Sequence, residues 1–222
     1  MARLKRILMV VTNSGHLDAQ HPTGVWFEEF AIPYQEFRAN GFEVTVASPR
    51  GGAAPIDPRS EPRPEQAREA TQAREALQHT VRLDSINPND FDAIFIPGGH
   101  GPLFDFPGNI PLQNTLRAYM EQGKMIAAVC HGPAAFDGVL LSDGMPLVAG
   151  KTMTAFTNHE ESAVKLDKLV PFLVETRLRE LGANFVERPD WSDHIERDGN
   201  LITAQNHQSS HSAARMLVEA LK

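Results

Sequence analysis

The architecture follows from one stretch of sequence, Lys124-Met125-Ile126-Ala127-Ala128-Val129-Cys130-His131-Gly132-Pro133. Small and β-branched apolar residues run as far as Val129, which is typical of a strand buried on both faces of a parallel sheet. Cys130 ends this strand, and the Gly-Pro pair that follows permits a sharp turn into a helix. This layout predicts a nucleophile elbow in which cysteine replaces the usual serine.

Cys130 is the only cysteine of the chain. A lone cysteine is more often a small buried hydrophobic residue than a nucleophile. The adjoining His131 and the strand-to-helix context favour the second interpretation. A thiol at a helix N-terminus would also be biased toward the thiolate, the reactive form. We therefore interpret the chain as a cysteine-dependent enzyme.

Short apolar runs alternate with helical stretches on either side of the elbow, which predicts an α/β fold with a mostly parallel sheet and helices on both faces. Ligands in such folds bind at the carboxyl ends of the strands. The expected strands are Arg6–Thr12, Glu43–Ala47, Ala93–Ile96 and Met125–Val129, with weaker ones near Lys151–Ala155, Asn184–Val186 and Leu201–Thr203. The expected helices are Gly24–Asn40, Pro64–His79, Leu112–Gln122, Pro133–Leu140, His159–Lys165, Val170–Leu181 and Ser209–Leu221.

Length and composition indicate a single domain over residues 1–222, since nothing divides the chain. Residues 49–89 differ from the rest in being turn-rich and then charged and Ala-rich. We expect them to form a surface insert that partly covers the site.

Charge and cysteine content narrow the class of protein. With 21 basic and 28 acidic residues the net charge is −7, which disfavours a nucleic-acid partner. No apolar run approaches the roughly 18 residues of a membrane span. The basic N-terminus leads into a first core strand instead of a signal peptide. A single cysteine suits a reducing, cytoplasmic location.

Glu29 is the second candidate. On a helix, the residues three and four positions from Glu29 are all apolar. One of them, Pro33, has no N–H and so cannot donate a hydrogen bond to the backbone carbonyl of Glu29. A carboxyl on an apolar face should have a raised pKa. Beside a thiol it would hold a proton and act as general acid and base. The alternative is that Glu28 and Glu29 merely favour the start of the helix through its dipole.

A glycine-rich turn, Pro97-Gly98-Gly99-His100-Gly101, follows another expected strand. Glycines allow close approach of the backbone to a ligand, and their N–H groups can form an oxyanion hole. The glycine spacing is not that of a dinucleotide-binding fingerprint. A plain tight turn is the alternative interpretation.

An imidazole next to a nucleophile needs an acceptor to orient it. The segment 157–161, Thr-Asn-His-Glu-Glu, offers two carboxylates for His131. Thr157 and Glu160 fit a capping box, which gives Glu160 a structural role. Glu161 is then the better candidate, with a solvated carboxylate at the helix start as the alternative.

Other histidines invite a metal interpretation. His207 and His211 are four residues apart, and His100 and His194 are further candidates. No HExxH pattern or cysteine pair accompanies them, so we expect no metal site and no cofactor. His207 remains a candidate for the substrate-binding region.

The chain resembles the DJ-1/PfpI superfamily over nearly its whole length, and within it the heat-shock-protein-31 (glyoxalase III-like) branch. The resemblance rests on these motifs: Thr23-Gly24-Val25-Trp26-Phe27-Glu28-Glu29, Pro33, Gly41-Phe42-Glu43-Val44, Ala47-Ser48-Pro49, Gly99-His100-Gly101-Pro102-Leu103-Phe104-Asp105, Ala127-Ala128-Val129-Cys130-His131-Gly132-Pro133-Ala134, Phe136-Asp137-Gly138 and Phe156-Thr157.

The resemblance implies a flavodoxin-like three-layer α/β/α sandwich and a homodimer. It implies Cys130 as nucleophile, Glu29 touching it, and His131 with Glu161 completing a triad. Backbone and side-chain groups of Gly98, Gly99, His100 and His207 would bind substrate or its oxyanion. The implied activity is cofactor-free conversion of methylglyoxal to lactate, with glycated or unfolded proteins as further partners of a deglycase or stress chaperone.

Two alternatives stay open at this stage. One is a cysteine hydrolase of the same superfamily, such as an amidase, a glutaminase-like enzyme or a peptidase. The other is a non-catalytic holdase or redox sensor, since an accessible thiol beside a carboxyl oxidises readily. One departure also bears on substrate choice: relatives often carry Asn-Pro where this chain has Gln205-Asn206-His207.

Overall fold

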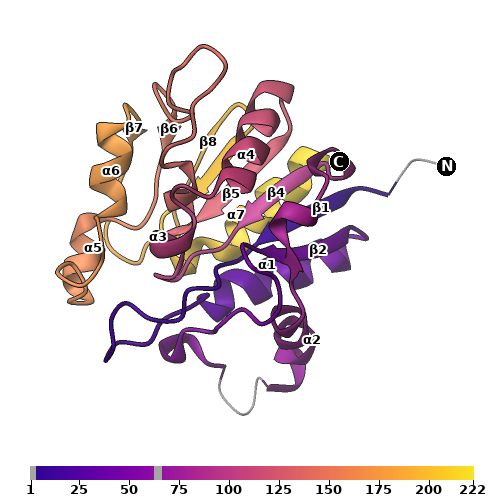
Figure 1. Ribbon diagram of the computed structural model, residues 1–222, viewed down its shortest axis with the longest axis horizontal. Helices are drawn as coiled ribbons and strands as arrows, with labels where there is room; N and C mark the ends of the chain where they lie inside the picture. The colour runs from indigo at the N-terminus through magenta and orange to yellow at the C-terminus, as the bar shows by residue number, and fades with distance from the viewer. Residues whose placement is uncertain (1–3, 63–66) are drawn as a thin grey trace.

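Seven strands form one central sheet in the computed structural model, which describes residues 4–62 and 67–222 (Figure 1). The spatial order is β3-β2-β1-β4-β5-β9-β8, and every neighbouring pair is parallel except β8 with β9. The strands are β1 (Arg6–Val10), β2 (Glu43–Ser48), β3 (Val81–Arg82), β4 (Ala93–Ile96), β5 (Met125–Val129), β8 (Ile195–Asp198) and β9 (Leu201–Ala204). A separate parallel pair joins β6 (Thr152–Met153) to β7 (Asn184–Phe185). The predicted α/β class is confirmed.

Helices cover both faces of this sheet (Figure 1). Because β2 and β5 lie on opposite sides of the β1-β4 pair, right-handed crossovers place α1 and α4 on opposite faces. The helix α7 packs beside α1, and α2 packs against α1 from outside. The α-helices are α1 (Phe27–Ala39), α2 (Ala67–Gln78), α3 (Pro102–Asp105), α4 (Ile110–Gln122), α5 (Asn158–Ala163), α6 (Val174–Glu180) and α7 (Ser210–Leu221). Short 3-10 helices are η1 (Pro58–Ser60), η3 (Leu83–Ser85), η4 (Pro88–Asp90), η5 (Gly132–Phe136) and η6 (His207–Ser209).

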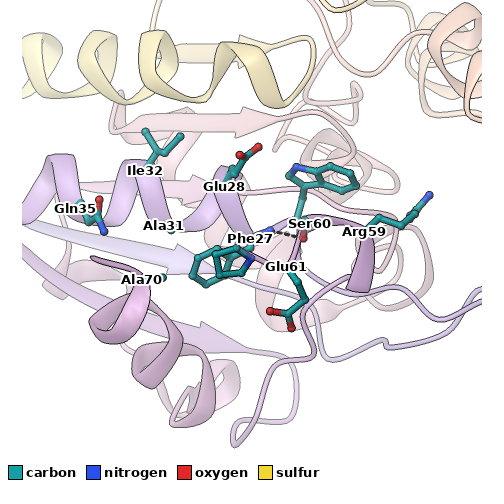
Figure 2. A pocket seen from close by; sticks show the side chains of 11 residues that line it. Phe27, Glu28, Ala31, Ile32, Gln35, Arg59, Ser60, Glu61 and Ala70 are labelled. Atoms are coloured by element: carbon teal, nitrogen blue, oxygen red, sulfur yellow. Dashed lines mark hydrogen bonds between the residues drawn. The ribbon is translucent and has the colours of Figure 1, made fainter. Parts of the chain in front are cut away.

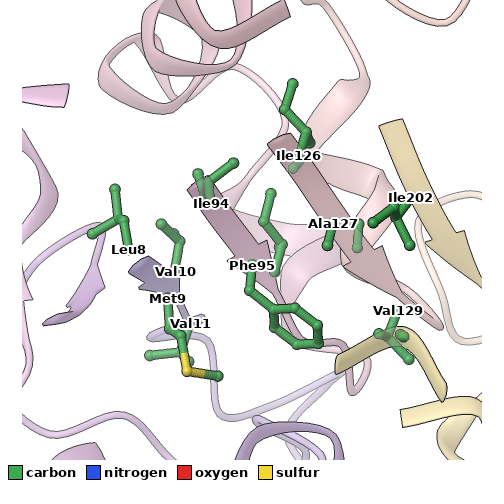
Figure 3. Close-up of a cluster of buried hydrophobic side chains, with 14 of the residues drawn as sticks. Leu8, Met9, Val10, Val11, Ile94, Phe95, Ile126, Ala127, Val129 and Ile202 are labelled. Atoms are coloured by element: carbon green, nitrogen blue, oxygen red, sulfur yellow. The ribbon is translucent and has the colours of Figure 1, made fainter. Parts of the chain in front are cut away.

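The core lies in the four central strands. Every residue of β4, β5 and β9 is buried, as is β1 after its first residue. Figure 3 shows this apolar layer, in which Met9, Phe95 and Val129 pack with their neighbours from adjacent strands. Burial on both faces explains why these strands read as continuous apolar runs with no alternation. The rigid sheet fixes the positions of the loops at its carboxyl edge.

The segment after β5 differs from the expected long helix over Pro133–Leu140. It is the five-residue η5, which ends at Phe136 before an isolated bridge between Leu140 and Pro146. The left-handed Gly138, with a φ of 81°, redirects the chain there. So short a 3-10 helix has little dipole, and the expectation that a helix N-terminus activates the thiol is wrong.

The insert at residues 49–89 is more than a surface excursion. It contributes the edge strand β3 to the sheet, and it buries Leu77 and Leu83 in the core. Its turn η1 reaches the carboxyl edge of the sheet, where Arg59 faces a pocket. The start of the expected helix Pro64–His79 lies outside the described residues. Among the residues described, no helix combines the length and apolar character that crossing a membrane requires.

Candidate active site

Cys130 directly follows β5, and its backbone is strained. Its φ of 59° lies in the left-handed region that cysteine rarely adopts. The conformation is held because the N–H of Cys130 donates to Ala204 O and its carbonyl accepts from Phe156 N. Strain at this point turns the side chain out of the strand direction, as the predicted elbow requires.

The same turn brings His131 to the thiol. Its Nδ1 lies 3.3 Å from the Cys130 Sγ, a contact that adjacent residues on a regular helix do not make. Its Nε2 lies 2.6 Å from Oε2 of Glu161, at the start of α5. His131 and Glu161 are both buried. A carboxylate only accepts, so the Nε2 carries the hydrogen and the Nδ1 lone pair faces the thiol.

Glu161 is fixed by its helix. Thr157 and Glu160 form the predicted capping box, with the Thr157 Oγ1 accepting from the Glu160 N–H at 3.0 Å. Burial alone would raise the pKa of Glu161, but the imidazoles of His131 and His100 outweigh burial and hold it well below its usual range. Glu161 is therefore an anion placed to orient His131 and to stabilise its cation.

Glu160 holds the far wall of the site together. Its Oε1 accepts hydrogen bonds from the backbone N–H of Trp191 and from the side-chain amides of Gln205 and Asn206. This buried carboxylate thus ties two separate loops to the first turn of α5. The sequence predicted only its local capping role.

Glu29 lies on the other side of the thiol, in the first turn of α1. Its Oε2 accepts the Gly98 N–H at 2.8 Å, and its buried Oε1 has no hydrogen-bond partner among the described residues. Burial raises its pKa to about 8, against the opposing effects of Cys130 and Gly98. The side chain is therefore a carboxylic acid at neutral pH, as the sequence predicted.

The thiol and this carboxyl form a coupled pair. Burial raises the pKa of Cys130 well above its usual range, and a charge on Glu29 raises it further. Protonation of Glu29 removes that second effect and supplies an O–H that can donate to sulfur. The two groups therefore titrate together instead of independently.

The glycine-rich turn after β4 lies against Glu29 and His131. A Cβ on Gly98 would lie 2.7 Å from the His131 nitrogen and 2.8 Å from the Glu29 Oε2, so only glycine fits. Gly99 has a φ of 87° and faces the pocket. The Gly98 N–H is used by Glu29, whereas the N–H groups of Gly99 and His131 have no partner among the described residues. These two are the candidate oxyanion donors.

These groups open onto a pocket of about 320 Å³. Aromatic rings form much of its wall: Trp26 and Trp191 lie 5.1 and 6.0 Å from the His207 ring, and Phe156 lies 5.8 Å from Trp191. Burial lowers the pKa of His207. The pocket is lined by Trp26, Glu29, Arg59, Gly99, His100, Cys130, Phe156, Val164, Trp191 and His207.

A second hollow of about 330 Å³ lies between α1 and residues 59–62, and it shares the side chains of Trp26 and Arg59 with the first (Figure 2). Its polar lining includes Glu28 and Glu61 but no thiol or imidazole. Of these two hollows, the one at Cys130 holds the thiol and the imidazoles.

The catalytic and substrate-binding candidates named from sequence lie together, though with different surroundings, whereas the metal candidates His194 and His211 pair elsewhere with Glu196 and Glu36. Cys130, Glu29, Gly99, His100 and His207 line the pocket, whereas the nearby side chains of His131 and Glu161 support it from behind. His100 is buried, and its two ring nitrogens contact Glu161 and Arg59.

The described residues place His100, His131 and Glu161 within reach of one ion. Each Nε2 is nevertheless paired with its own Glu161 oxygen, and the outer nitrogens face Cys130 and Arg59. The arrangement fits a hydrogen-bond cluster.

Sequence reasoning missed Arg59 and Trp191 as parts of this site. Asp57-Pro58 does signal a turn, and Asp57 caps η1 as such pairs do. That turn reaches the site only through tertiary packing. Trp191 gives no local signal, since its φ of 61° is imposed by the loop that Glu160 holds.

Comparison with known proteins gives consistent matches. The DJ-1/PfpI family matches residues 23–220. The chain is 30% identical to the glutathione-independent glyoxalase HSP31 of Saccharomyces cerevisiae over 98% of each protein. It is similar to the crystal structure of glyoxalase III from Candida albicans, with a TM-score of 0.87, 29% identity and 97% of each chain covered. It also resembles the Rapid Encystment Protein of Francisella tularensis, with a TM-score of 0.93, 30% identity and coverage of 99% and 100%.

Proposed function

The chain belongs to the DJ-1/PfpI family, and from that premise we propose that it is a cysteine-dependent, glutathione-independent glyoxalase. Its substrates would be methylglyoxal and related 2-oxoaldehydes, and its products 2-hydroxy acids. One observation supports this most directly: a thiol and a carboxyl with a pKa of about 8 face the same small pocket. Isomerising an oxoaldehyde needs a nucleophile and a group that both gives and takes a proton.

The first step is addition of the thiol to the aldehyde. His131 Nδ1 takes the Cys130 proton, and the sulfur attacks the aldehyde carbon to form a hemithioacetal. The N–H groups of Gly99 and His131 would stabilise the developing oxyanion. Glu161 would stabilise the imidazolium.

The second step moves hydrogen between the two oxygen-bearing carbons. Glu29 first gives its proton to the C1 oxygen of the hemithioacetal, and the carboxylate that remains can then remove the proton from C1 to give an enediolate and return it to C2. Transfer of the C1 hydroxyl proton to the C2 oxygen leaves a thioester on Cys130. Glu29 lines the pocket, whereas His131 lies behind it, so Glu29 is the better candidate for this shuttle. Water then cleaves the thioester, and overall methylglyoxal and water give lactate and a proton.

Turnover of methylglyoxal without added metal or glutathione tests the proposal. Lactate should form with the wild type and not with Cys130→Ala. Glu28→Gln is a matched control, because Glu28 adjoins Glu29 on α1 but faces the second hollow. Absence of lactate from a folded wild type whose thiol is alkylated normally would contradict the proposal, and glutamine and peptide substrates would then test the hydrolase alternative.

Other parts of the proposal are separable from the activity. A cytoplasmic location would keep the lone thiol reduced. Deglycase activity, a holdase role and a homodimer also stay predictions. Suppression of client aggregation by both Cys130→Ala and wild type would identify a holdase independent of catalysis, and sedimentation would give the oligomeric state.

A further inference from the structure

His100 makes polar contacts through both ring nitrogens, although it is buried. Its Nε2 lies 2.8 Å from the Glu161 Oε1, and its Nδ1 lies 3.1 Å from the Arg59 Nη2. Its ring lies 4.1 Å from that of His131, between centroids. Glu161 therefore carries one imidazole on each oxygen, and only His131 touches the thiol.

These contacts are compatible with one protonation state of His100. A guanidinium can only donate, so the Nδ1 facing Arg59 must carry a lone pair. A carboxylate can only accept, so the Nε2 facing Glu161 must carry the hydrogen. His100 is thus held as the neutral Nε2–H tautomer. Its pKa points the same way: burial is the largest cause that lowers it to about 4, and the neighbouring His131 and Arg59 lower it further.

Arg59 is held firmly enough to impose this state. Its Nε and Nη2 donate to the two oxygens of Asp57, at 2.9 and 2.5 Å. Asp57 is buried and accepts a further hydrogen bond from the Thr23 hydroxyl. The Arg59 guanidinium also lies 5.7 Å from the Trp26 ring centre. The insert thereby delivers a fixed cation to the back of the site.

The charge state of His100 affects His131, because both imidazoles are hydrogen-bonded to Glu161. The charged and titratable groups that face His100 are Arg59 from η1, Glu161 from α5 and His131 from the elbow. A protonated His100 would repel the imidazolium that forms on His131 and would take part of the Glu161 charge. His131 would then be a weaker base toward Cys130.

We propose that Arg59 is a positioning residue: it keeps His100 neutral, and so reserves the charge of Glu161 for His131 when His131 takes the thiol proton. The inference rests on the proposed function only where turnover is the readout. Its two main tests use the free protein and no substrate.

The first test is the nitrogen-15 NMR spectrum of His100 as a function of pH, assigned with His100→Asn. In the wild type the neutral Nε2–H form should persist from pH 8 down to pH 5.5. In Arg59→Met the ring should titrate at a higher pH than in wild type, or show an Nδ1–H form, because Nδ1 is freed and a repelling charge is lost. An Nδ1–H tautomer in the wild type, or an unchanged titration and tautomer in Arg59→Met, would overturn the proposal.

The second test is the rate of Cys130 alkylation by iodoacetamide. Because Arg59 is only one of the groups that lower the His100 pKa, Arg59→Met should react about twofold more slowly than wild type at pH 5.5 and nearly equally at pH 8. Arg59→Lys keeps a donor and a charge, and should recover most of the rate. Slowing by the same factor at every pH would mean a structural role and would overturn the proposal.

Arg74→Met is the matched control. Arg74 belongs to the same insert, pairs with Glu61 at 2.5 Å and lies 5.5 Å from the Phe27 ring centre, but does not contact His100. It should alkylate like wild type at both pH values. In turnover, Arg59→Met should lower kcat most strongly at acid pH. A change in KM alone, with normal alkylation, would instead assign Arg59 to substrate binding and overturn the positioning role.

Discussion

Two buried carboxyl groups lie on opposite sides of Cys130, and they are in opposite states. Burial raises the pKa of Glu29, on α1, to about 8, because the carboxyl accepts one backbone N–H and no cation among the described residues contacts it. Glu161, on α5, contacts two imidazoles, and its pKa is held well below the usual range. Both side chains are almost fully buried. Partners, more than burial, therefore decide which carboxyl is charged.

The difference in protonation state gives Glu29 and Glu161 different roles in the reaction. A carboxylic acid can give a proton and take it back, which is what the substrate carbons require. A carboxylate can orient an imidazole and stabilise its cation. An ionised Glu29 could not donate a proton, and a protonated Glu161 could not stabilise the His131 cation. Substituting each residue by glutamine tests the two roles separately.

The largest effect is expected from Glu29→Gln. The amide still offers an oxygen to the Gly98 N–H, but it cannot exchange a proton with sulfur or substrate. We expect kcat to fall about 10³-fold, within the range for loss of a general acid–base. The measurement is lactate formation at pH 7, beside Glu28→Gln, and near-normal kcat in Glu29→Gln would remove Glu29 from the mechanism.

Glu161→Gln should cost less, about 10²-fold in kcat, because His131 keeps a hydrogen-bond partner but loses the charge that stabilises its cation. Alkylation of Cys130 should slow in parallel, since it also needs His131 as a base. A drop in turnover with unchanged alkylation would contradict this assignment of Glu161.

The pH dependence of kcat/KM should reveal Glu29 directly. Above a pH of about 8 the carboxyl ionises, and activity should fall about tenfold per pH unit. The residual activity of Glu29→Gln should lack this alkaline limb. Persistence of the limb in the variant would assign it to another group.

The smallest effects are expected on stability, where Glu29→Gln should raise the Tm and Glu161→Gln should lower it. Because the folded-state pKa of Glu29 lies above its unfolded value of 4.5, Glu29 costs stability progressively from pH 4.5 to about 8. Glu29→Gln escapes that cost, so its Tm at pH 8 should exceed that of wild type.

Glu161 has the opposite linkage. Its folded pKa is depressed, so the stability from its ionisation is present above pH 4.5 and is lost as the pH falls through the folded pKa. Glu161→Gln should therefore melt below wild type at pH 7, by a margin that shrinks below pH 4.5. Calorimetry at several pH values measures both variants, and a shared sign at pH 8 would contradict the comparison.

Much of this contrast could be predicted from local sequence. Apolar neighbours at helical spacing indicated that Glu29 is buried and protonated, and the capping box left Glu161 as the partner of His131. The apolar runs predicted the central strands for the same reason: burial on two faces leaves a clear pattern.

What was missed depends on tertiary contacts. The two-residue β3 and the antiparallel β8 carry weak patterns because they lie at sheet edges and are partly exposed. Arg59 reaches His100 across 41 positions of sequence, and no local pattern encodes that contact. The dipole argument for the thiol was wrong because η5 is too short.

The most direct test of the account is infrared difference spectroscopy of the resting enzyme at pH 6.5. Wild type minus Glu29→Gln should contain the carbonyl band of a protonated carboxylic acid. Wild type minus Glu161→Gln should contain only carboxylate bands. A carboxylate signal from Glu29, or an acid signal from Glu161, would contradict the division of labour between the two groups.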